Sequence, residues 1–372
     1  MAPPIRLSYE PLDLALRVPW TISRGTRVRA ENVLVRLRWR APDGRELEGL
    51  GEAAPYAFYG ELRGTVEACL DEFAGLLGDD PFAIDTVLDA IEARLRHNPS
   101  AKAALDLALH DLAGKAAGRP LWQWWGLDPA RGPLTSFSIG LDEPEVMAQK
   151  AREAAAFPIL KIKVGTPRDV EIVRAVREAV PAARLVVDAN AAWTPKQAVR
   201  TIAQLEPFGV ELVEQPVAAR DLAGLRYVRE ASALPIIADE SCATEADVPA
   251  LAGCVDGVNV KLMKCGGLHR ARRLIAAARA HHLAVMCGCL IESSLAITAA
   301  SHLLPLLDYA DLDGNLLLAD DPFDGVRCAA GKLTLPTGPG LGVVDRRTSP
   351  APLEAGARGG PRQRAAGGGE GG

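Results

Sequence analysis

Hydrophobic and polar residues alternate along the first forty positions in the manner of β-strands. In residues 5–40, most clearly in ENVLVRLRWR, apolar side chains recur at every second position, the period of a strand with one buried face. APDGRE then supplies a hairpin turn into LEGLGEAAP. From about residue 62 to 118 the apolar residues recur at intervals of three and four, as in helices. The first third of the chain is therefore expected to be an α+β unit.

Beyond GRPLWQWWGLDPARGP the pattern becomes repetitive. Short apolar runs alternate with helical stretches rich in Ala, Arg, Leu and Glu, at a spacing of roughly 25 residues. The eight predicted strands are TSFSIG (135–140), ILKIKVG (159–165), RLVVDAN (184–190), VELVEQP (210–216), PIIADES (235–241), GVNVKL (257–262), LAVMCGC (283–289) and YADLDG (309–314). Such a series is typical of a parallel β/α barrel, and a doubly wound open sheet is the alternative.

Composition narrows the class of partner. The 42 basic and 47 acidic residues give a net charge of −5, which does not favour wholesale binding to nucleic acid or to anionic membranes. Apolar runs are broken by charges before they reach membrane-spanning length, and MAPPIRLSYE lacks the apolar core of a signal peptide. Seven scattered cysteines without a CxxC pair indicate reduced thiols in the cytoplasm. We expect a small-molecule partner.

Three carboxylates follow successive predicted strands. Asp188 in VVDAN, Glu214 in VEQP and Asp239 in IADES are 26 and 25 residues apart, one β/α unit each. Each alone could be a helix N-cap, but three in register at the carboxyl ends of barrel strands are better explained as ligands of a hard cation. Oxygen donors favour one Mg²⁺ per subunit, with Mn²⁺ as the alternative. Asn190 and Glu240 are predicted to orient these carboxylates.

Lysines occupy the neighbouring strands. Lys161 and Lys163 in ILKIKVG share one face of a strand, so negative charge must lie nearby, and we expect their repulsion to lower the proton affinity of one of them. Lys261 ends a strand on the opposite side of the predicted barrel. A neutral Lys163 could remove a proton next to a carboxylate, and protonated Lys261 could return one to the other face. Two such bases indicate epimerisation or racemisation, whereas one base with a leaving group indicates elimination.

The motifs KxK, D-A-N, E-Q-P, A-D-E-S and N-x-K-L-x-K-x-G-G, in this order, resemble the enolase superfamily, muconate-lactonizing subgroup. The resemblance extends to about residue 345 and implies a modified (β/α)7β TIM-type barrel with an N-terminal α+β capping domain. We therefore expect a capping domain at 1–125, completed by 315–347, and a catalytic barrel at 126–314. Residues 348–372, rich in Gly, Pro, Ala and Arg, are expected to be a disordered tail without a catalytic role.

Within that subgroup the chain resembles dipeptide epimerases of the L-Ala-D/L-Glu type. The resemblance implies that Asp311 and Asp313 in ADLDG bind the dipeptide's α-ammonium, although an acidic turn is the alternative. It also implies that Lys161 contacts the substrate carboxylate and that Ser136, where relatives often have Thr, contacts substrate. Arg24 in TISRGTRVRAENVLVRL matches an arginine that in some members meets a glutamate side chain.

Several alternatives stay open at this point. Arg27 and Arg29 flank Arg24, so the sequence does not decide which arginine reaches substrate, and Arg24 could be a solvated loop residue. An o-succinylbenzoate synthase, an N-acylamino acid racemase or, less favoured, a muconate cycloisomerase would share the lysines and metal ligands but not need the acidic pair. Two more distant alternatives are a barrel enzyme that forms a Schiff base through a lysine and a non-catalytic metal-binding barrel. The predicted function is Mg²⁺-dependent dipeptide epimerisation, with homo-oligomerisation undecided.

Overall fold

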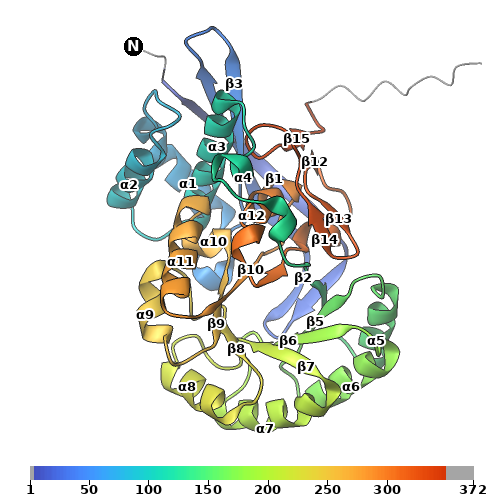
Figure 1. Ribbon diagram of the computed structural model, residues 1–372. Coiled ribbons are helices and arrows are strands. Elements are labelled where there is room, and N and C mark those ends of the chain that lie inside the picture. The colour runs from blue at the N-terminus through green and yellow to red at the C-terminus, as the bar shows by residue number, and fades with distance from the viewer. Residues whose placement is uncertain (1–3, 349–372) are drawn as a thin grey trace, which may run out of the picture.

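A three-stranded antiparallel sheet forms the N-terminal part of the computed structural model, which describes residues 4–348 (Figure 1). Its strands are β1 (Arg6–Ile22), β2 (Gly25–Arg40) and β3 (Glu46–Ala53), paired in that order. The alternating pattern predicted for residues 5–40 is thus a long hairpin. Its tip, at residues 23–24, was not predicted because the sequence there has no Asn-Gly or Asp-Gly turn signature. Gly25, with φ of 135°, supplies the conformation that the turn needs.

Three helices follow, α1 (Arg63–Phe73), α2 (Ile84–Arg94) and α3 (Pro99–Ala117), as the helical periodicity predicted. β3 packs directly on α3: a Cβ at Gly49 would lie 2.1 Å from Ala108 O, and one at Gly51 would lie 1.9 Å from Ala104 O. Only glycine permits this approach of strand to helix. No helix within residues 4–348, α3 included, is both long and apolar enough to cross a membrane.

The second part is an eight-stranded parallel sheet that closes on itself. The strands are β4 (Phe137–Ile139), β5 (Ile159–Lys163), β6 (Arg184–Asp188), β7 (Val210–Glu214), β8 (Ile236–Ala238), β9 (Gly257–Val260), β10 (Ala284–Gly288) and β11 (Tyr309–Asp311). They pair in sequence order, and the edge strands meet where Ser136 N donates to Ala310 O at 2.9 Å. The predicted (β/α)7β barrel is confirmed, and the closure excludes the doubly wound open sheet.

Helical segments connect the barrel strands and surround them (Figure 1). They are α5 (Pro144–Glu153), α6 (Asp169–Ala179), α7 (Pro195–Leu205), α8 (Leu222–Ala231), α9 (Val248–Leu251), α10 (Leu262–Cys265), α11 (Leu268–Ala280) and α12 (Ser294–Ser301), and α4 (Leu121–Trp124) precedes the barrel. Parallel strands linked by helices place all eight strand carboxyl ends at one mouth of the barrel, where side chains from distant parts of the sequence meet.

The segment after the barrel returns to the N-terminal sheet (Figure 1). It forms β12 (Phe323–Asp324), β13 (Arg327–Ala329), β14 (Lys332–Thr334) and β15 (Val344–Asp345). Leu318 bridges Leu16 of β1, and Asp345 Oδ2 lies 2.5 Å from Arg36 Nη2 of β2. On these contacts we propose that residues 315–347 belong with the N-terminal unit. The predicted tail lies, apart from residue 348, outside the described residues.

A buried carboxylate joins the N-terminal sheet to the barrel. Glu52 of β3 accepts hydrogen bonds from Asn32 Nδ2 (2.7 Å), from Ser293 N (3.0 Å) and from Ser293 Oγ, at the amino end of α12. Asn32 also donates to Ile291 O at 3.0 Å. Glu52 therefore caps a barrel helix from the other unit and fixes the chain segment that follows β10.

Replacing Glu52 with alanine is expected to lower the free energy of unfolding by about 3 kcal/mol, because buried donors of Asn32 and Ser293 lose their acceptor. Glu52→Gln is the matched control: it keeps one acceptor oxygen and the side-chain volume, so its loss should be smaller. Urea denaturation followed by circular dichroism measures both. Equal stabilities for Glu52→Ala and the unmodified protein would contradict this account of the joint.

Candidate active site

The carboxyl ends of the barrel strands carry the charged residues that the sequence singled out. Lys163, Asp188 and Glu214 are the last residues of β5, β6 and β7, and the ladder register sets them side by side. Asp239 and Lys261 come directly after β8 and β9. All five are buried. The fold therefore gathers two lysines and three carboxylates at one mouth of the barrel.

Ion pairs explain how buried lysines are tolerated. Lys163 Nζ lies 2.6 Å from Asp188 Oδ2, and Lys261 Nζ lies 2.8 Å from Asp239 Oδ2. Burial alone would lower the pKa of Lys261, but attraction by Asp239 outweighs it and raises the pKa well above its usual value. The carboxylates thus hold a proton on Lys261 in this arrangement.

Lys161 lies deeper, among three carboxylates. Its Nζ is 2.6 Å from Glu214 Oε2, 2.6 Å from Asp311 Oδ2 and 3.4 Å from Asp188 Oδ2. Burial would lower its pKa, but Asp311, Glu214 and Asp188 together raise it well above the usual value. The lowered proton affinity expected for one of the two lysines is therefore not found at Lys161, because three close opposite charges outweigh one like charge.

The donor set suits a hard divalent cation. As the side chains stand, no three Asp, Glu, His or Cys side chains within residues 4–348 converge as a metal site, and Lys161 Nζ lies between Asp188 and Glu214. Glu214 Oε2, however, is buried and makes no hydrogen bond, since Lys161 approaches it outside hydrogen-bond geometry. Burial and the charge of Asp188 raise the pKa of Glu214 to about 7. A cation shared by these carboxylates would relieve both defects, so the residues fit Mg²⁺.

Asn190 contacts one predicted metal ligand, Asp188, as expected from the sequence. Its backbone N donates to Asp188 Oδ1 at 2.8 Å and its Nδ2 to Asp188 Oδ2 at 3.2 Å. Glu240 is one step further away: its Oε1 accepts from Asn190 Nδ2 at 3.5 Å and from Arg24 Nη1 at 2.7 Å. Glu240 therefore acts on Asp188 through Asn190 rather than directly.

Two supporting residues were not assigned roles from the sequence. Lys264 is buried and donates to Asp239 Oδ1 (2.6 Å), Cys242 O (2.9 Å) and Asn259 O (3.0 Å). Asn259 Nδ2 donates to Glu214 Oε1 at 2.8 Å. The motif N-x-K-L-x-K-x-G-G contains both, and their polar side chains in an apolar strand and turn were the available signal. They orient Asp239 and Glu214.

The acidic pair lies at the end of β11. Asp311 Oδ1 accepts from Ser136 Oγ at 2.7 Å and from Ser138 Oγ at 3.2 Å. Asp313 Oδ2 accepts from Ser138 N at 2.6 Å. Burial and the neighbouring Asp311 raise the pKa of Asp313 to about 7. A cationic group placed here would favour the ionised form of both carboxylates.

Ser138, rather than the predicted Ser136, faces the cavity at this mouth of the barrel. Both side chains contact Asp311, but Ser138 lines the cavity and Ser136 does not. The physical reason is register: β4 begins at Phe137, so Ser136 precedes the strand and lines a separate cavity at the amino end of the barrel. Of the two serines, Ser138 is therefore the one placed at the cavity, and the expected substrate contact of Ser136 stays a prediction that its position does not favour.

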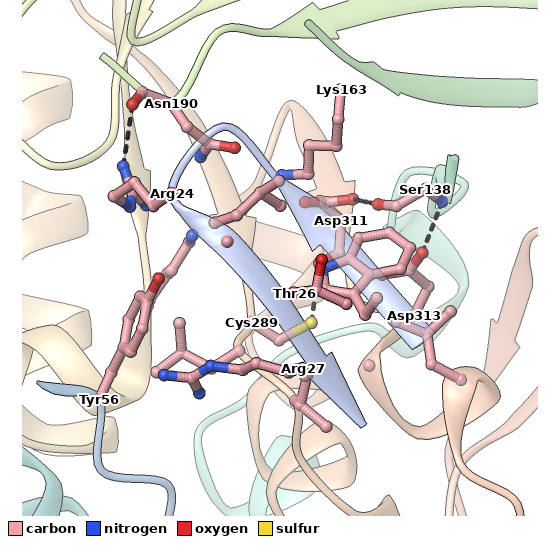
Figure 2. A pocket seen from close by; sticks show the side chains of 18 residues that line it. Arg24, Thr26, Arg27, Tyr56, Ser138, Lys163, Asn190, Cys289, Asp311 and Asp313 are labelled. Carbon is pink, nitrogen blue, oxygen red and sulfur yellow. Dashed lines mark hydrogen bonds between the residues drawn. The ribbon is translucent and has the colours of Figure 1, made fainter. Parts of the chain in front are cut away.

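Arg24 stands at the tip of the β1–β2 hairpin, over the barrel mouth. Its Nη1 donates to Asn190 O at 2.9 Å as well as to Glu240, and its guanidinium carbon is 4.3 Å from the centre of the Phe58 ring. Figure 2 shows Arg24 beside Asn190, with Lys163 across the cavity. The solvated-loop alternative for Arg24 is thus excluded.

A cavity of about 210 Å³ joins these groups. Lys163, Lys261, Asp311, Asp313 and Arg24 line it. The three predicted metal ligands do not line it, and two of them, Asp188 and Asp239, pair with the lysines that do. The hairpin of β1 and β2 covers one side, so the cavity lies between the N-terminal sheet and the barrel. Its apolar lining residues are Trp20, Ile22, Leu290, Ile291 and Leu317.

Known proteins resemble this chain along nearly its whole length. It is 38% identical over 342 residues to the L-Ala-D/L-Glu epimerase of Bacteroides thetaiotaomicron, covering 91% of this chain and 88% of that protein. It is 39% identical over 343 residues to the hydrophobic dipeptide epimerase of Enterococcus faecalis, covering 89% and 96%. The crystal structure of dipeptide epimerase from E. faecalis V583 complexed with Mg and L-Leu-L-Tyr superposes with a TM-score of 0.86 at 38% identity, covering 92% of this chain and 99% of that one.

Family models account for both parts of the fold. Residues 9–126 match the mandelate racemase / muconate lactonizing enzyme N-terminal domain, and residues 145–347 match the enolase C-terminal domain-like family. The two matches cover the N-terminal sheet and helices and nearly the whole barrel with its C-terminal return. The chain therefore belongs to the mandelate racemase / muconate lactonizing enzyme family of the enolase superfamily.

Proposed function

We propose that this protein is a Mg²⁺-dependent dipeptide epimerase that inverts the α-carbon of the C-terminal residue. The observation that carries the proposal is the placement of two lysines. Lys163 ends β5 and Lys261 follows β9, four strands apart in a closed sheet of eight, so they enter the cavity from opposite sides. A carbon acid bound between them has one amine on each face.

The proton transfers follow from this arrangement. The neutral amine of one lysine takes the α-proton, the C–H bond breaks, and its electron pair moves into the carboxylate to give an enediolate. The ammonium of the other lysine then gives a proton to the opposite face, which inverts the centre. The roles of Lys163 and Lys261 reverse for the other stereoisomer. Lys161 supplies fixed positive charge for the substrate carboxylate.

Asp188, Glu214 and Asp239 are the residues that would hold Mg²⁺, in keeping with the Mg present in the related E. faecalis complex. Bound there, the ion supplies Lewis-acid stabilisation of the enediolate and weakens the hold of these carboxylates on the lysine protons. Asn190, Asn259 and Lys264 keep the three carboxylates oriented through the hydrogen bonds described above.

A dipeptide is favoured over an N-acylated amino acid because the cavity has an anionic end. Asp311 and Asp313 offer paired carboxylates that suit a free α-ammonium, whereas an acyl group or a succinyl benzoate would leave them without a counter-charge. Relatives at 38–39% identity carry dipeptide-epimerase names. The substrates of an N-acylamino acid racemase or o-succinylbenzoate synthase therefore fit less well.

Asp313→Asn should weaken kcat/KM for dipeptides about 10- to 100-fold more than for the matching N-acetyl amino acids, because only dipeptides lose an ion pair. Epimerisation of L-Ala-L-Glu and of N-acetyl-L-Glu, followed by chiral chromatography, measures both. Equal losses for the two substrate types would count against the ammonium assignment.

The function itself is tested by incubating a panel of L,L-dipeptides with the protein and Mg²⁺ in deuterated water and following α-proton signals by NMR. Exchange should appear at the C-terminal residue's α-carbon. If borohydride instead trapped a lysine adduct with a carbonyl substrate in the presence of EDTA, a Schiff-base enzyme would replace this proposal.

We also propose a cytoplasmic location, which the seven free cysteines support. Five of these thiols are buried, including Cys287 of the CGC sequence, where burial raises the pKa of the thiol well above its usual value and keeps it protonated. Homo-oligomerisation stays a prediction.

A further inference from the structure

Three arginines follow one another at the hairpin that covers the cavity, and only two of them reach it. Arg24 and Arg27 line the cavity, whereas Arg29 does not. Arg29 is exposed, with an ion pair to Glu31 on the same strand. The stretch SRGTRVR therefore contributes two guanidinium groups to the substrate-binding region.

Arg24 already has a counter-charge within the protein. Its Nη1 is 2.7 Å from Glu240 Oε1, and the Glu240 side chain is fully buried in this contact. The same nitrogen donates to Asn190 O. Because Asn190 orients Asp188, Arg24 is tied to the support of the predicted metal ligands. The charge of Arg24 is therefore already paired with Glu240.

Arg27 is in a different position. Its guanidinium carbon lies 4.0 Å from the centre of the Tyr56 ring, and the side chain is half-buried. Among the described residues, no carboxylate oxygen lies within 4.0 Å of it, in contrast to both of its neighbours in the stretch. Stacking fixes the plane of the guanidinium on Tyr56 and leaves its N–H groups free for a planar anion.

The two ends of the cavity differ in charge. Figure 2 shows Arg24, Arg27 and Tyr56 toward one side and Asp311 and Asp313 toward the other. The apolar ring of Trp20 lies near the acidic side. A Cβ at Gly140, just after β4, would lie 3.1 Å from this ring, and Ser138 of β4 contacts both Asp311 and Asp313. A dipeptide with its ammonium on the aspartates thus has a small apolar wall beside its first residue and a cation near its second.

We propose that Arg27 is the specificity-determining residue of this site and that it selects dipeptides whose C-terminal residue has an acidic side chain. The inference rests on the proposed dipeptide epimerisation and deepens it. Relatives of nearly equal identity are named for L-Ala-D/L-Glu and for hydrophobic dipeptides, so likeness alone does not choose between them. An apolar side chain would bury the Arg27 charge further without a partner, whereas a carboxylate pairs with it.

The test compares two isosteric substrates, L-Ala-L-Glu and L-Ala-L-Gln, with the Mg²⁺-loaded full-length protein. The unmodified protein should have the higher kcat/KM for the glutamate substrate. Arg27→Gln should lower kcat/KM about 10- to 100-fold for L-Ala-L-Glu and by less than about threefold for L-Ala-L-Gln, the size expected for one charge-assisted hydrogen-bonded pair. Arg27→Lys, which keeps the charge, should recover part of the loss.

Two further variants separate Arg27 from its neighbours. Arg29→Gln removes the same charge from the same strand outside the cavity, and it should leave the preference unchanged. Arg24→Gln should lower both substrates alike, because it disturbs Asn190 and Glu240 rather than a side-chain contact. If Arg24→Gln instead abolished the preference while Arg27→Gln did not, Arg24 would be the selector and this proposal would fall.

The outcomes also distinguish a failure of the Arg27 proposal from a failure of the proposed dipeptide epimerisation. Exchange with dipeptides but no preference for L-Ala-L-Glu over L-Ala-L-Gln overturns the role of Arg27 and leaves the epimerase proposal standing. No exchange with any dipeptide overturns both. A preference for glutamate that Arg27→Gln removes and Arg29→Gln keeps supports the inference.

Discussion

Lys163→Ala is expected to reduce the rate of dipeptide epimerisation by about 10²- to 10⁴-fold, the contribution usual for a positioned general base. Lys163 ends β5 and faces the cavity, and the other amine on its side of the barrel, Lys161, is held among three carboxylates. No second base is therefore placed to replace it. The rate is measured by polarimetry with L-Ala-L-Glu at saturating Mg²⁺.

Lys196→Ala is the control for this prediction, because Lys196 is exposed on α7 and does not line the cavity. It should keep the full rate. Since Lys163 is ion-paired with Asp188, circular dichroism must show that Lys163→Ala is folded. A folded Lys163→Ala protein with more than about a tenth of the original rate would remove Lys163 from the mechanism.

Glu214→Gln is expected to weaken Mg²⁺ binding by at least about 100-fold, since even residues that only orient a metal ligand contribute 10- to 100-fold. The buried, unbonded Oε2 of Glu214 becomes a neutral amide atom, and one of three charged donors is lost. Isothermal titration calorimetry with MgCl₂ measures the affinity without reference to activity.

The matched control is Glu211→Gln, three residues earlier on β7. Glu211 pairs with Arg184, and both line a separate cavity at the opposite end of the barrel. Its replacement should leave the affinity for Mg²⁺ within about twofold. Unchanged affinity in a folded Glu214→Gln protein would mean that the cation, if it binds, uses other residues.

Much of the fold could be predicted because its elements are strongly periodic. Each predicted barrel strand corresponds to an observed one, and the 25-residue repeat correctly placed Asp188, Glu214 and Asp239 at successive strand ends. Strand ends could be predicted because an acidic residue after three or four apolar residues is a local pattern. A parallel barrel then brings the ends of its strands close together. The hairpin tip at residues 23–24 lacked such a signal.

Two properties could not be predicted from the sequence: the register of a strand relative to the barrel mouth, and the balance of opposite and like charges around a buried group. Ser136, just before β4, and Ser138, within it, are two residues apart, and only the position of the strand relative to the barrel mouth decides which of them lines the cavity. The pKa of Lys161 depends on how many carboxylates lie within 4 Å of its amine, and the spacing of residues in the sequence does not reveal that number. Likewise, Arg24, Arg27 and Arg29 look alike until their partners are known.

The central claim is that two amines face one α-carbon from opposite sides, and Lys261→Ala in deuterated water tests it most directly. With Lys163 alone, one stereoisomer of the dipeptide should exchange its α-proton for deuterium without inversion, the other should not exchange, and epimerisation should cease. Proton NMR with separate incubations of L-Ala-L-Glu and L-Ala-D-Glu distinguishes these results. Continued epimerisation by folded Lys261→Ala, or equal exchange of both stereoisomers, would contradict the two-sided arrangement.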